Sequence, residues 1–343
     1  MKEFHDMRFD SIQVLRAIAA LLVVAEHIHF LSCGAFGVDI FFCISGFMIM
    51  FTTHRSTDHF LIKRFLRIAP LYYIMTFFTF FIVSLVPSMF VHTTGGIPAL
   101  IKSLFFIPFD VGQGYIQPLV RIGWTINLEM FFYCIFWISF HISHKYRGFI
   151  CSFFLLLIVL VGPLISSYQL PIEMYNAIHF WSDPIILEFV LGIISYDVLR
   201  WIYEYVQKHP QKMNRLIGKS CMILSIIMIL ILVDHRMDWA YTGLTRILVW
   251  GIPSMLIMIG FFIAGLSLQM NRWWVMLGNI SFSLYMVHYY PIQFFDRILF
   301  DFSTLRADSL FFSLLVTIFV IILSYFMYLW IEKRFTSWIL QKI

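Results

Sequence analysis

The sequence has 343 residues, of which 61% are hydrophobic and 13% are charged. Water-soluble chains average about 45–50% hydrophobic and about 25% charged residues, so this composition excludes a soluble globular protein, a disordered chain and a nucleic-acid-binding protein. At about 20 residues per crossing, the apolar residues suffice for roughly ten transmembrane helices. The formal net charge of +5 is modest, so the placement of the charges is more informative than their sum.

Ten apolar segments of spanning length follow one another, at about 11–31, 35–53, 70–91, 123–141, 149–168, 178–199, 216–233, 247–268, 273–295 and 310–330. A shorter apolar stretch at about 97–109 contains Lys102 and Pro108, which predicts an interfacial or re-entrant segment. The loops are too short to hold a folded core of their own. We therefore expect an all-α, polytopic membrane protein: a single membrane domain over residues 1–343, with no appended soluble domain.

The basic residues predict how this domain is oriented. With the amino terminus in the cytoplasm, seventeen of the 24 Lys and Arg residues fall on the cytoplasmic side and six, Arg246 among them, fall in outer loops. Loops on the cytoplasmic side of membrane proteins carry an excess of positive charge. The sequence therefore predicts that both termini face the cytoplasm.

Several ionisable residues lie inside predicted spans, where each costs about 2.5–3.5 kcal/mol on insertion scales. Arg16 and His27 are eleven residues apart in the first span, about 20° past three full turns, so both point along one face. At about 1.5 Å per residue, each of four groups from different spans lies roughly 6–10 Å below the outer boundary. These are His27, Asp39, Glu129 and His288. We expect them to share one polar layer, although hydrogen bonding that only joins helices remains an alternative.

The segment FLIKRFLRIAP places Arg64 and Arg67 three residues apart, beside Lys63. Residues at this spacing are neighbours on a helix, and paired guanidinium groups suit phosphate because each offers a planar fork of donors. Pro70 is expected to begin the third span. Basic flanks also orient membrane proteins and contact anionic lipids, and this alternative stays open.

Five strings occur in a fixed order: SIQVLRAIAALLVVAEH, GVDIFFCISGFMI, KRFLRIAPLYY, GWTINLEMFFY and LGNISFSLYMVHYYP. Together they resemble the acyltransferase 3 family of integral-membrane acyltransferases, particularly its exopolysaccharide O-acetylating members, over about residues 10–335. The resemblance implies a ten-helix core that takes an acyl group, usually acetyl, from cytoplasmic acetyl-CoA. The acceptor would be a hydroxyl of a carbohydrate or lipid-linked glycan, and the location a bacterial inner membrane.

The resemblance also implies roles for individual residues. His27 matches the histidine regarded as catalytic and Arg16 its basic partner, while Arg64 and Arg67 match the RxxR pair linked with the acyl-CoA donor. Further site candidates fall in the matching strings: Asp39, Ser45, Trp124, Glu129, Ser281, Tyr285 and His288. After the last span, WIEKRF keeps Glu332 but lacks the proline often found there, which leaves the role of this end open.

Acyl transfer to a hydroxyl needs a base for the hydroxyl proton and exclusion of water. Histidine suits the first task, so we predict His27 as general base, with Asp39 or Glu129 orienting its ring. Direct transfer and a transient acyl-imidazole on His27 are both open. Arg16, Arg64 and Arg67 would bind acetyl-CoA, and the pattern of His, Cys and carboxylates predicts no metal site.

Two other functions fit part of this pattern. A transporter or flippase for a sugar or lipid-linked glycan also carries polar residues inside its helices, but it favours midplane sites and repeated halves. A structural subunit of a polysaccharide-export complex would need no catalytic histidine. Acceptor-dependent consumption of acetyl-CoA distinguishes the enzyme from both, and the oligomeric state, homo-oligomer included, stays open.

Overall fold

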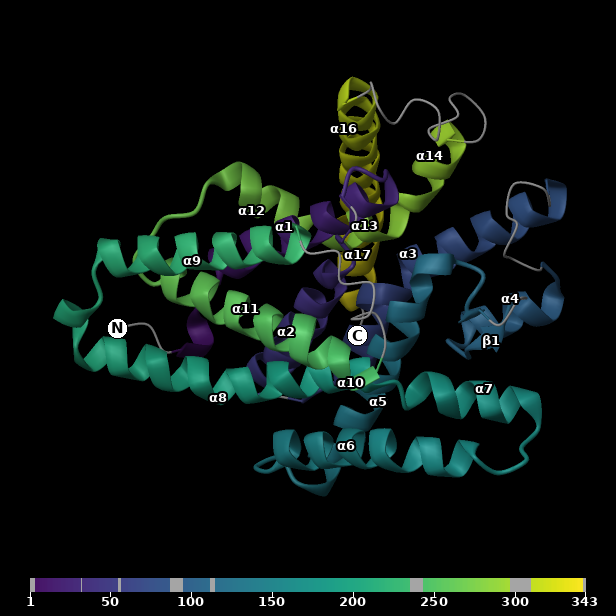
Figure 1. Ribbon diagram of the computed structural model, residues 1–343, viewed down its shortest axis with the longest axis horizontal. Helices are drawn as coiled ribbons and strands as arrows, with labels where there is room; N and C mark the ends of the chain where they lie inside the picture. The colour runs from purple at the N-terminus through teal and green to yellow at the C-terminus, as the bar shows by residue number, and fades with distance from the viewer. Residues whose placement is uncertain are drawn as a thin grey trace. The chain divides into compact units, whose positions relative to one another are not determined.

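The computed structural model describes residues 4–31, 33–54, 57–86, 95–111, 115–234, 243–296 and 310–341, nearly all of them helical (Figure 1). The chain divides into two compact units. Unit 1 comprises Met1–Asp58 and Pro184–Phe282, and unit 2 comprises His59–Asp183 and Ser283–Ile343. The all-α, polytopic fold class is confirmed, whereas a single membrane domain over the whole chain stays a prediction.

Unit 1 is helical. Its elements in chain order are η1 (Phe4–Asp6), α1 (Asp10–His27), α2 (Phe36–Thr52), η4 (Pro184–Ile186), α8 (Leu187–Lys208), η5 (Pro210–Lys212), α9 (Arg215–Asp234), α10 (Gly243–Arg246), the π-helix η7 (Ile247–Gly251), α11 (Ile252–Gly265) and α12 (Arg272–Asn279). α13 (Ser281–Val287) begins at the end of this unit.

Close backbone contact holds α2 against α8. A Cβ added at Gly46 would lie 2.2 Å from the carbonyl oxygen of Phe189, and one at Gly192 would lie 2.1 Å from that of Cys43. Small residues allow membrane helices to approach this closely, and packing of this kind replaces the hydrophobic driving force that lipid removes. Two segments far apart in the sequence are thereby fixed to each other, which matters for the polar residues they carry.

Unit 2 contains the remaining elements. They are α3 (Phe60–Leu85), α4 (Ile97–Leu104), β1 (Phe109–Asp110), β2 (Ile116–Gln117), η3 (Arg121–Gly123), α5 (Trp124–Ile142), α6 (Arg147–Ser166), α7 (Ile172–Trp181), α14 (Tyr289–Phe294), α16 (Leu310–Met327), the π-helix η9 (Tyr328–Phe335) and α17 (Thr336–Leu340). The two strands pair antiparallel, with Phe109 opposite Gln117.

Pro70 lies inside α3 and does not begin a new element, so our expectation that it starts the third span is wrong. Proline removes the hydrogen bond to the carbonyl four residues earlier, here that of Leu66. The Thr336 hydroxyl lies within hydrogen-bond distance of this carbonyl oxygen, at 3.4 Å, and of the carbonyl oxygen of Ile331, at 3.1 Å. Because a membrane helix tolerates proline where a neighbour satisfies the freed backbone group, FLIKRF and the apolar stretch after it form one helix.

The stretch at about 97–109 folds as α4 followed by β1. Phe109, Val111 and Leu119 form a small hydrophobic cluster, and Ala99 and Leu100 of α4 pack against it. Lys102 of α4 donates to Glu173 of α7 over 2.6 Å. This hydrogen bond, reinforced by the charge of Lys102, lowers the pKa of the Glu173 carboxyl. An interfacial or re-entrant position for the stretch stays a prediction.

Six helical segments in the described residues are long and apolar enough to cross a membrane: Phe60–Leu85, Arg121–Ile142, Arg147–Ser166, Arg215–Asp234, Gly243–Gly265 and Leu310–Ile339. In the last of these only 17% of the apolar window is buried within the protein, and in Arg215–Asp234 only 22%. Such large exposed apolar faces require an apolar surrounding. The chain is therefore an integral membrane protein.

Four of the ten predicted spans are not among these six segments. α1 and α2 are helices over the first two predicted spans, but α1 carries Asp10, Arg16 and Glu26, and α2 has only 17 residues. The continuous span at 178–199 is wrong, because the chain breaks between α7 and α8, where Pro184 disfavours helix in the residue before it. The span at 273–295 is also wrong as one helix, since α12, α13 and α14 are separate. Gly278 precedes the first of these breaks, and glycine is a poor helix former.

Candidate active site

His27 is the last residue of α1 and is half-buried. Its Nδ1 lies 2.8 Å from the carbonyl oxygen of Val23, one turn earlier. A carbonyl can only accept a hydrogen bond, so Nδ1 carries the proton and Nε2 is the basic nitrogen of the neutral ring. The last turn of a helix also favours a positive charge, because the macrodipole is negative there. The histidine is thus oriented by its own helix to take a proton at Nε2.

Glu26 joins the end of α1 to the start of α2. Its carboxylate lies near the backbone N–H groups of Gly34 and Ala35, directly before α2, while its Oε2 forms no hydrogen bond with any described residue. A Cβ added at Gly34 would meet the carbonyl oxygen of Leu22 at 2.1 Å, so the chain returns in close contact with α1. The position of His27 relative to α2 is therefore fixed on both sides of the turn.

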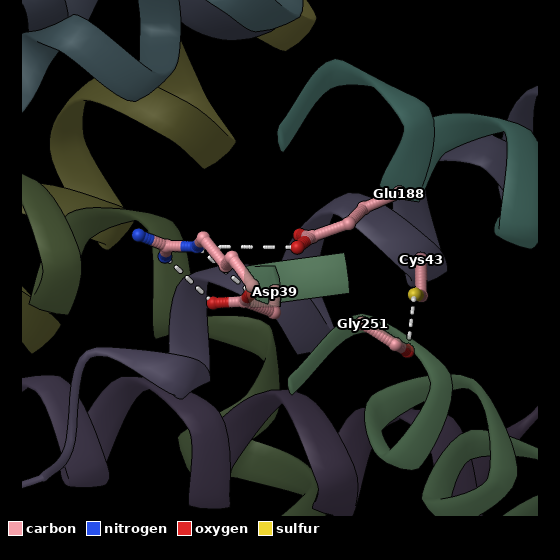
Figure 2. A network of polar contacts seen from close by, with 5 residues as sticks. Asp39, Cys43, Glu188 and Gly251 are labelled. Carbon is pink, nitrogen blue, oxygen red and sulfur yellow. Dashed lines mark hydrogen bonds and ion pairs between the residues drawn. The ribbon is translucent and has the colours of Figure 1, made fainter. Parts of the chain in front are cut away.

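A buried ion pair joins α2 to α10. Arg246 donates from Nε to Oδ1 of Asp39 over 3.0 Å and from Nη2 to Oδ2 over 2.8 Å. The same Nε lies 4.0 Å from Oε1 of Glu188, and Figure 2 shows both carboxylates directed toward this guanidinium group. All three residues are buried. A bidentate arginine–carboxylate pair fixes orientation as well as distance.

An aromatic ring completes the surroundings of this arginine. The guanidinium carbon of Arg246 lies 4.9 Å from the ring centroid of Trp250, which is completely buried. Such cation–π contacts stabilise a guanidinium group more strongly where water is excluded. We refer to Asp39, Glu188, Arg246 and Trp250 as the Arg246 cluster.

Glu26 is close enough to Asp39 and Arg246 for their charges to act on it. The cluster and the end of α1 are therefore neighbours within unit 1. If all three carboxylates are ionised, they outnumber the single guanidinium, and the excess negative charge stabilises a cation beside it. We predicted that Asp39 orients the His27 ring, and this role stays a prediction. The Asp39 carboxylate accepts hydrogen bonds from Arg246, and the contact described for His27 is with the carbonyl oxygen of Val23.

The other unit 1 candidates lie on the same helices. Arg16 is half-buried on α1, and Ser45 is half-buried on α2. Ser281 is completely buried, and its hydroxyl forms no hydrogen bond with any described residue. These positions leave the proposed role of Arg16 untested and give Ser281 the character of a packed interior residue.

In unit 2, Arg64 lies against aromatic rings and near a carboxylate. Its guanidinium carbon is 5.6 Å from the centroid of Tyr133 and 5.7 Å from that of Phe60. The Tyr133 hydroxyl donates to Oε1 of Glu129, and the charges of Glu129 and Arg67 both act on Arg64. The sequence assigned Glu129 to an outer layer and Arg64 to the inner surface, whereas the structure places them in one polar group. Arg67 and Lys63 are exposed on the same helix.

Tyr285 and His288 form a second polar group in unit 2. The Tyr285 hydroxyl donates to the carbonyl oxygen of Ile122 over 3.0 Å and lies 2.9 Å from the hydroxyl of Thr125. Nδ1 of His288 donates to the carbonyl oxygen of Tyr285 over 2.6 Å, and the ring is completely buried. Trp124, half-buried, begins the helix that carries Thr125. These contacts tie the break after α13 to the start of α5.

Glu332, whose role the sequence left open, accepts a hydrogen bond from Ser283 of α13. This contact joins the π-helix η9 to α13. His27 and Asp39 belong to unit 1 and Glu129 and His288 to unit 2, so their common layer stays a prediction.

Sequence reasoning missed the residue at the centre of the unit 1 site. Arg246 was expected in an outer loop, but the structure shows it buried at the end of α10, within the apolar segment Gly243–Gly265. Two signals pointed to it: carboxylates at Asp39 and Glu188 need a cation if buried, and Trp250 follows four residues later, on the same helical face. Within the described residues, no group of three or more His, Cys, Asp or Glu is arranged to hold a metal ion.

The fold and the site define an integral membrane protein with a half-buried histidine at the end of α1 and a buried arginine–carboxylate cluster in the same unit. Residues 9–329 match the model of the acyltransferase 3 family, described as "Acyltransferase domain" (Acyl_transf_3). The chain therefore belongs to this acyltransferase family, and the resemblance seen in its sequence is confirmed.

Individual relatives agree with this assignment. The chain is 31% identical over 170 residues to "Exopolysaccharide production protein ExoZ" of Rhizobium meliloti (strain 1021), covering 48% of this chain and 51% of that protein. It is 25% identical over 322 residues to "Putative O-acetyltransferase SACOL0978" of Staphylococcus aureus (strain COL), covering 85% and 52%. It is 25% identical over 323 residues to "Putative peptidoglycan O-acetyltransferase YrhL" of Bacillus subtilis (strain 168), covering 84% and 49%. The chain thus spans about half the length of these curated relatives, and no solved structure matches it.

Proposed function

We propose that this protein transfers an acetyl group from acetyl-CoA, bound from the cytoplasm, to a hydroxyl of a cell-surface or exported carbohydrate. The observation that carries the proposal is the His27 ring, whose Nδ1 is committed to the Val23 carbonyl. Family membership favours acyl transfer over transport. The relatives' names mention an exopolysaccharide and peptidoglycan, and these support a carbohydrate acceptor. We place the reaction in a bacterial inner membrane, as the resemblance of the sequence implies.

In the proposed reaction, Nε2 of His27 takes the proton of the acceptor hydroxyl while the hydroxyl oxygen bonds to the carbonyl carbon of the thioester. The carbon–sulfur bond then breaks, and the imidazolium returns the proton to the leaving thiolate, so atoms and charge balance. If Glu26 and both carboxylates of the Arg246 cluster are ionised, their excess negative charge stabilises the transient imidazolium. An acyl-imidazole intermediate would use the same nitrogen as nucleophile.

The basic residues of α3 suit the phosphates of the acyl donor. Arg67 and Lys63 are exposed on one helix, and an exposed guanidinium fork can bind phosphate bidentately. Arg64 contacts Phe60 and Tyr133, and the charge of Glu129 acts on it. We therefore assign Arg64 to holding this part of α3 in place and Arg67 to direct contact with the phosphates. Arg16, on the His27 helix, would line the path of the pantetheine arm.

Everted membrane vesicles containing the protein provide a test, because their cytoplasmic face is accessible. Given acetyl-CoA labelled in the acetyl group, they should transfer label to the carbohydrate fraction and release one free thiol per acetyl group transferred. A transporter would release no thiol. Absence of both signals, relative to vesicles lacking the protein, would refute the proposal.

A further inference from the structure

A cavity of about 600 Å³ opens in unit 1 between the start of α9 and the segment that joins α11 to α12. The first half of α9 packs against the second half of α11, with Gly218 against Ser267 and Gly260 against Ser225. The polar part of the cavity wall consists of Arg215, Lys219, Ser267, Gln269, Asn271 and Trp274. No acidic residue is among the described residues that line it, so the cavity favours a negatively charged occupant.

The two cations are placed where the helix alone would disfavour them. Arg215 is the first residue of α9 and Lys219 lies one turn later, so the two charges are neighbours on one face and repel each other. Both also lie at the positive end of the helix dipole. Among the described residues neither has an ion-pair partner. An anion in the cavity would relieve both unfavourable interactions.

A second helix begins at the same cavity. The side chain of Asn214 accepts from the N–H of Ile217 at the start of α9, and Asn271 accepts from that of Trp273 at the start of α12. Each cap satisfies one backbone donor and leaves others at these helix starts for a ligand. Two positive helix ends and two cationic side chains thus converge on one space, the arrangement expected of a phosphate site.

The surroundings of the cavity are those of a membrane surface. On α9, the apolar side chains of Leu216, Ile223 and Leu224 are 70%, 55% and 65% exposed, as expected for residues in contact with lipid. Trp273 and Trp274 are 72% and 41% exposed at the start of α12, and tryptophan accumulates at the level of lipid head groups. An occupant with a phosphate and acyl chains would satisfy both the cavity and this apolar face.

We propose that this cavity binds the phosphate of an anionic phospholipid head group, with the acyl chains lying along α9. Basic pockets between membrane helices bind such head groups through the same combination of charge and helix ends. The site is separate from the Arg246 cluster and does not depend on which acceptor the enzyme uses. A phosphate of the acyl donor shares this chemistry, and the experiment distinguishes the two sources.

The test uses the purified full chain in a neutral detergent, titrated with dioctanoyl phosphatidylglycerol and followed by native mass spectrometry. The wild type should bind this lipid in preference to the phosphatidylcholine analogue. Arg215→Gln/Lys219→Gln should bind it about 30-fold more weakly, given the contribution of each basic side chain near an anionic surface. Lys208→Gln/Lys212→Gln removes the same charge from the ends of α8 and η5, outside the cavity lining, and should bind as the wild type does.

Adenosine 3′,5′-bisphosphate serves as the probe for the donor's phosphates. If it binds in the cavity and phosphatidylglycerol does not displace it, the site belongs to the acyl donor and the lipid proposal is overturned. Equal binding of the two lipids by the wild type, or equal losses in the two double variants, would overturn it as well. Thermal unfolding without lipid confirms that each variant is folded.

Discussion

Replacement of Arg246 by methionine tests the Arg246 cluster, because it removes the charge while keeping a long side chain. The wild-type arginine makes two charge-assisted hydrogen bonds to Asp39, each worth about 1.5–3 kcal/mol. The variant leaves Asp39 and Glu188, both 0% exposed, without their cation. Removing one partner of a buried ion pair costs about 3–5 kcal/mol, which corresponds to a fall in the midpoint of thermal unfolding of about 4–7 °C for a chain of this size.

Arg200 provides the matched control. It pairs with Glu204 at 2.9 Å, but the two side chains are 43% and 49% exposed, and exposed pairs contribute about 0–1 kcal/mol. Arg200→Met should therefore move the midpoint by no more than about 2 °C. Thermal unfolding in detergent, read by size-exclusion chromatography after heating, measures both variants. Equal midpoints for Arg246→Met and Arg200→Met would refute the reasoning, whereas adding Asp39→Asn to Arg246→Met should recover part of the loss.

Two further predictions concern helix packing and the donor site. Gly192→Ala should destabilise the protein by about 2 kcal/mol or more, because its Cβ would lie 2.1 Å from a backbone oxygen of α2. Gly251→Ala meets only side-chain atoms at 3.2 Å or beyond and should lower the unfolding midpoint less; the reverse order would contradict the packing described. Arg67→Gln should weaken acetyl-CoA binding about tenfold in calorimetry, since it removes a charged contact. The control is Arg272, an exposed arginine of unit 1, and Arg272→Gln should leave the affinity for acetyl-CoA unchanged. Equal affinities in the wild type and Arg67→Gln would remove Arg67 from the donor site.

The helices with many apolar residues were predictable from composition. Six of the ten spans coincide with helices long and apolar enough to cross a membrane, because burial in lipid depends on average hydropathy and length. The two spans that proved discontinuous were not predictable in this way. A window average does not register the residue before Pro184 or the break after Gly278, although both determine where a helix ends.

His27 lies on the first predicted helix, as expected from the apolar run that contains it. The contact that orients its ring, with the carbonyl oxygen of Val23, was not predicted, because we expected Asp39 or Glu129 in that role. Arg246 was not predictable in the same way, because its partners lie 207 and 58 positions away in the chain, on α2 and α8. Close contacts at Gly46 and Gly192 bring those helices together, and a contact between distant segments leaves no periodic pattern in the sequence.

The central claim, that Nε2 of His27 moves the proton, is tested most directly by His27→Asn. The asparagine amide can occupy the place of Nδ1–H and donate to Val23, while no basic nitrogen remains where Nε2 lies. His141 makes the same contact with the carbonyl of Trp137, also at 2.8 Å, so His141→Asn is the geometric control. In labelled acetyl-CoA assays with everted vesicles, we expect His27→Asn to lose at least about 100-fold in transfer, as removal of a general base does, and His141→Asn to match the wild type. Wild-type transfer by a folded His27→Asn protein would contradict the account.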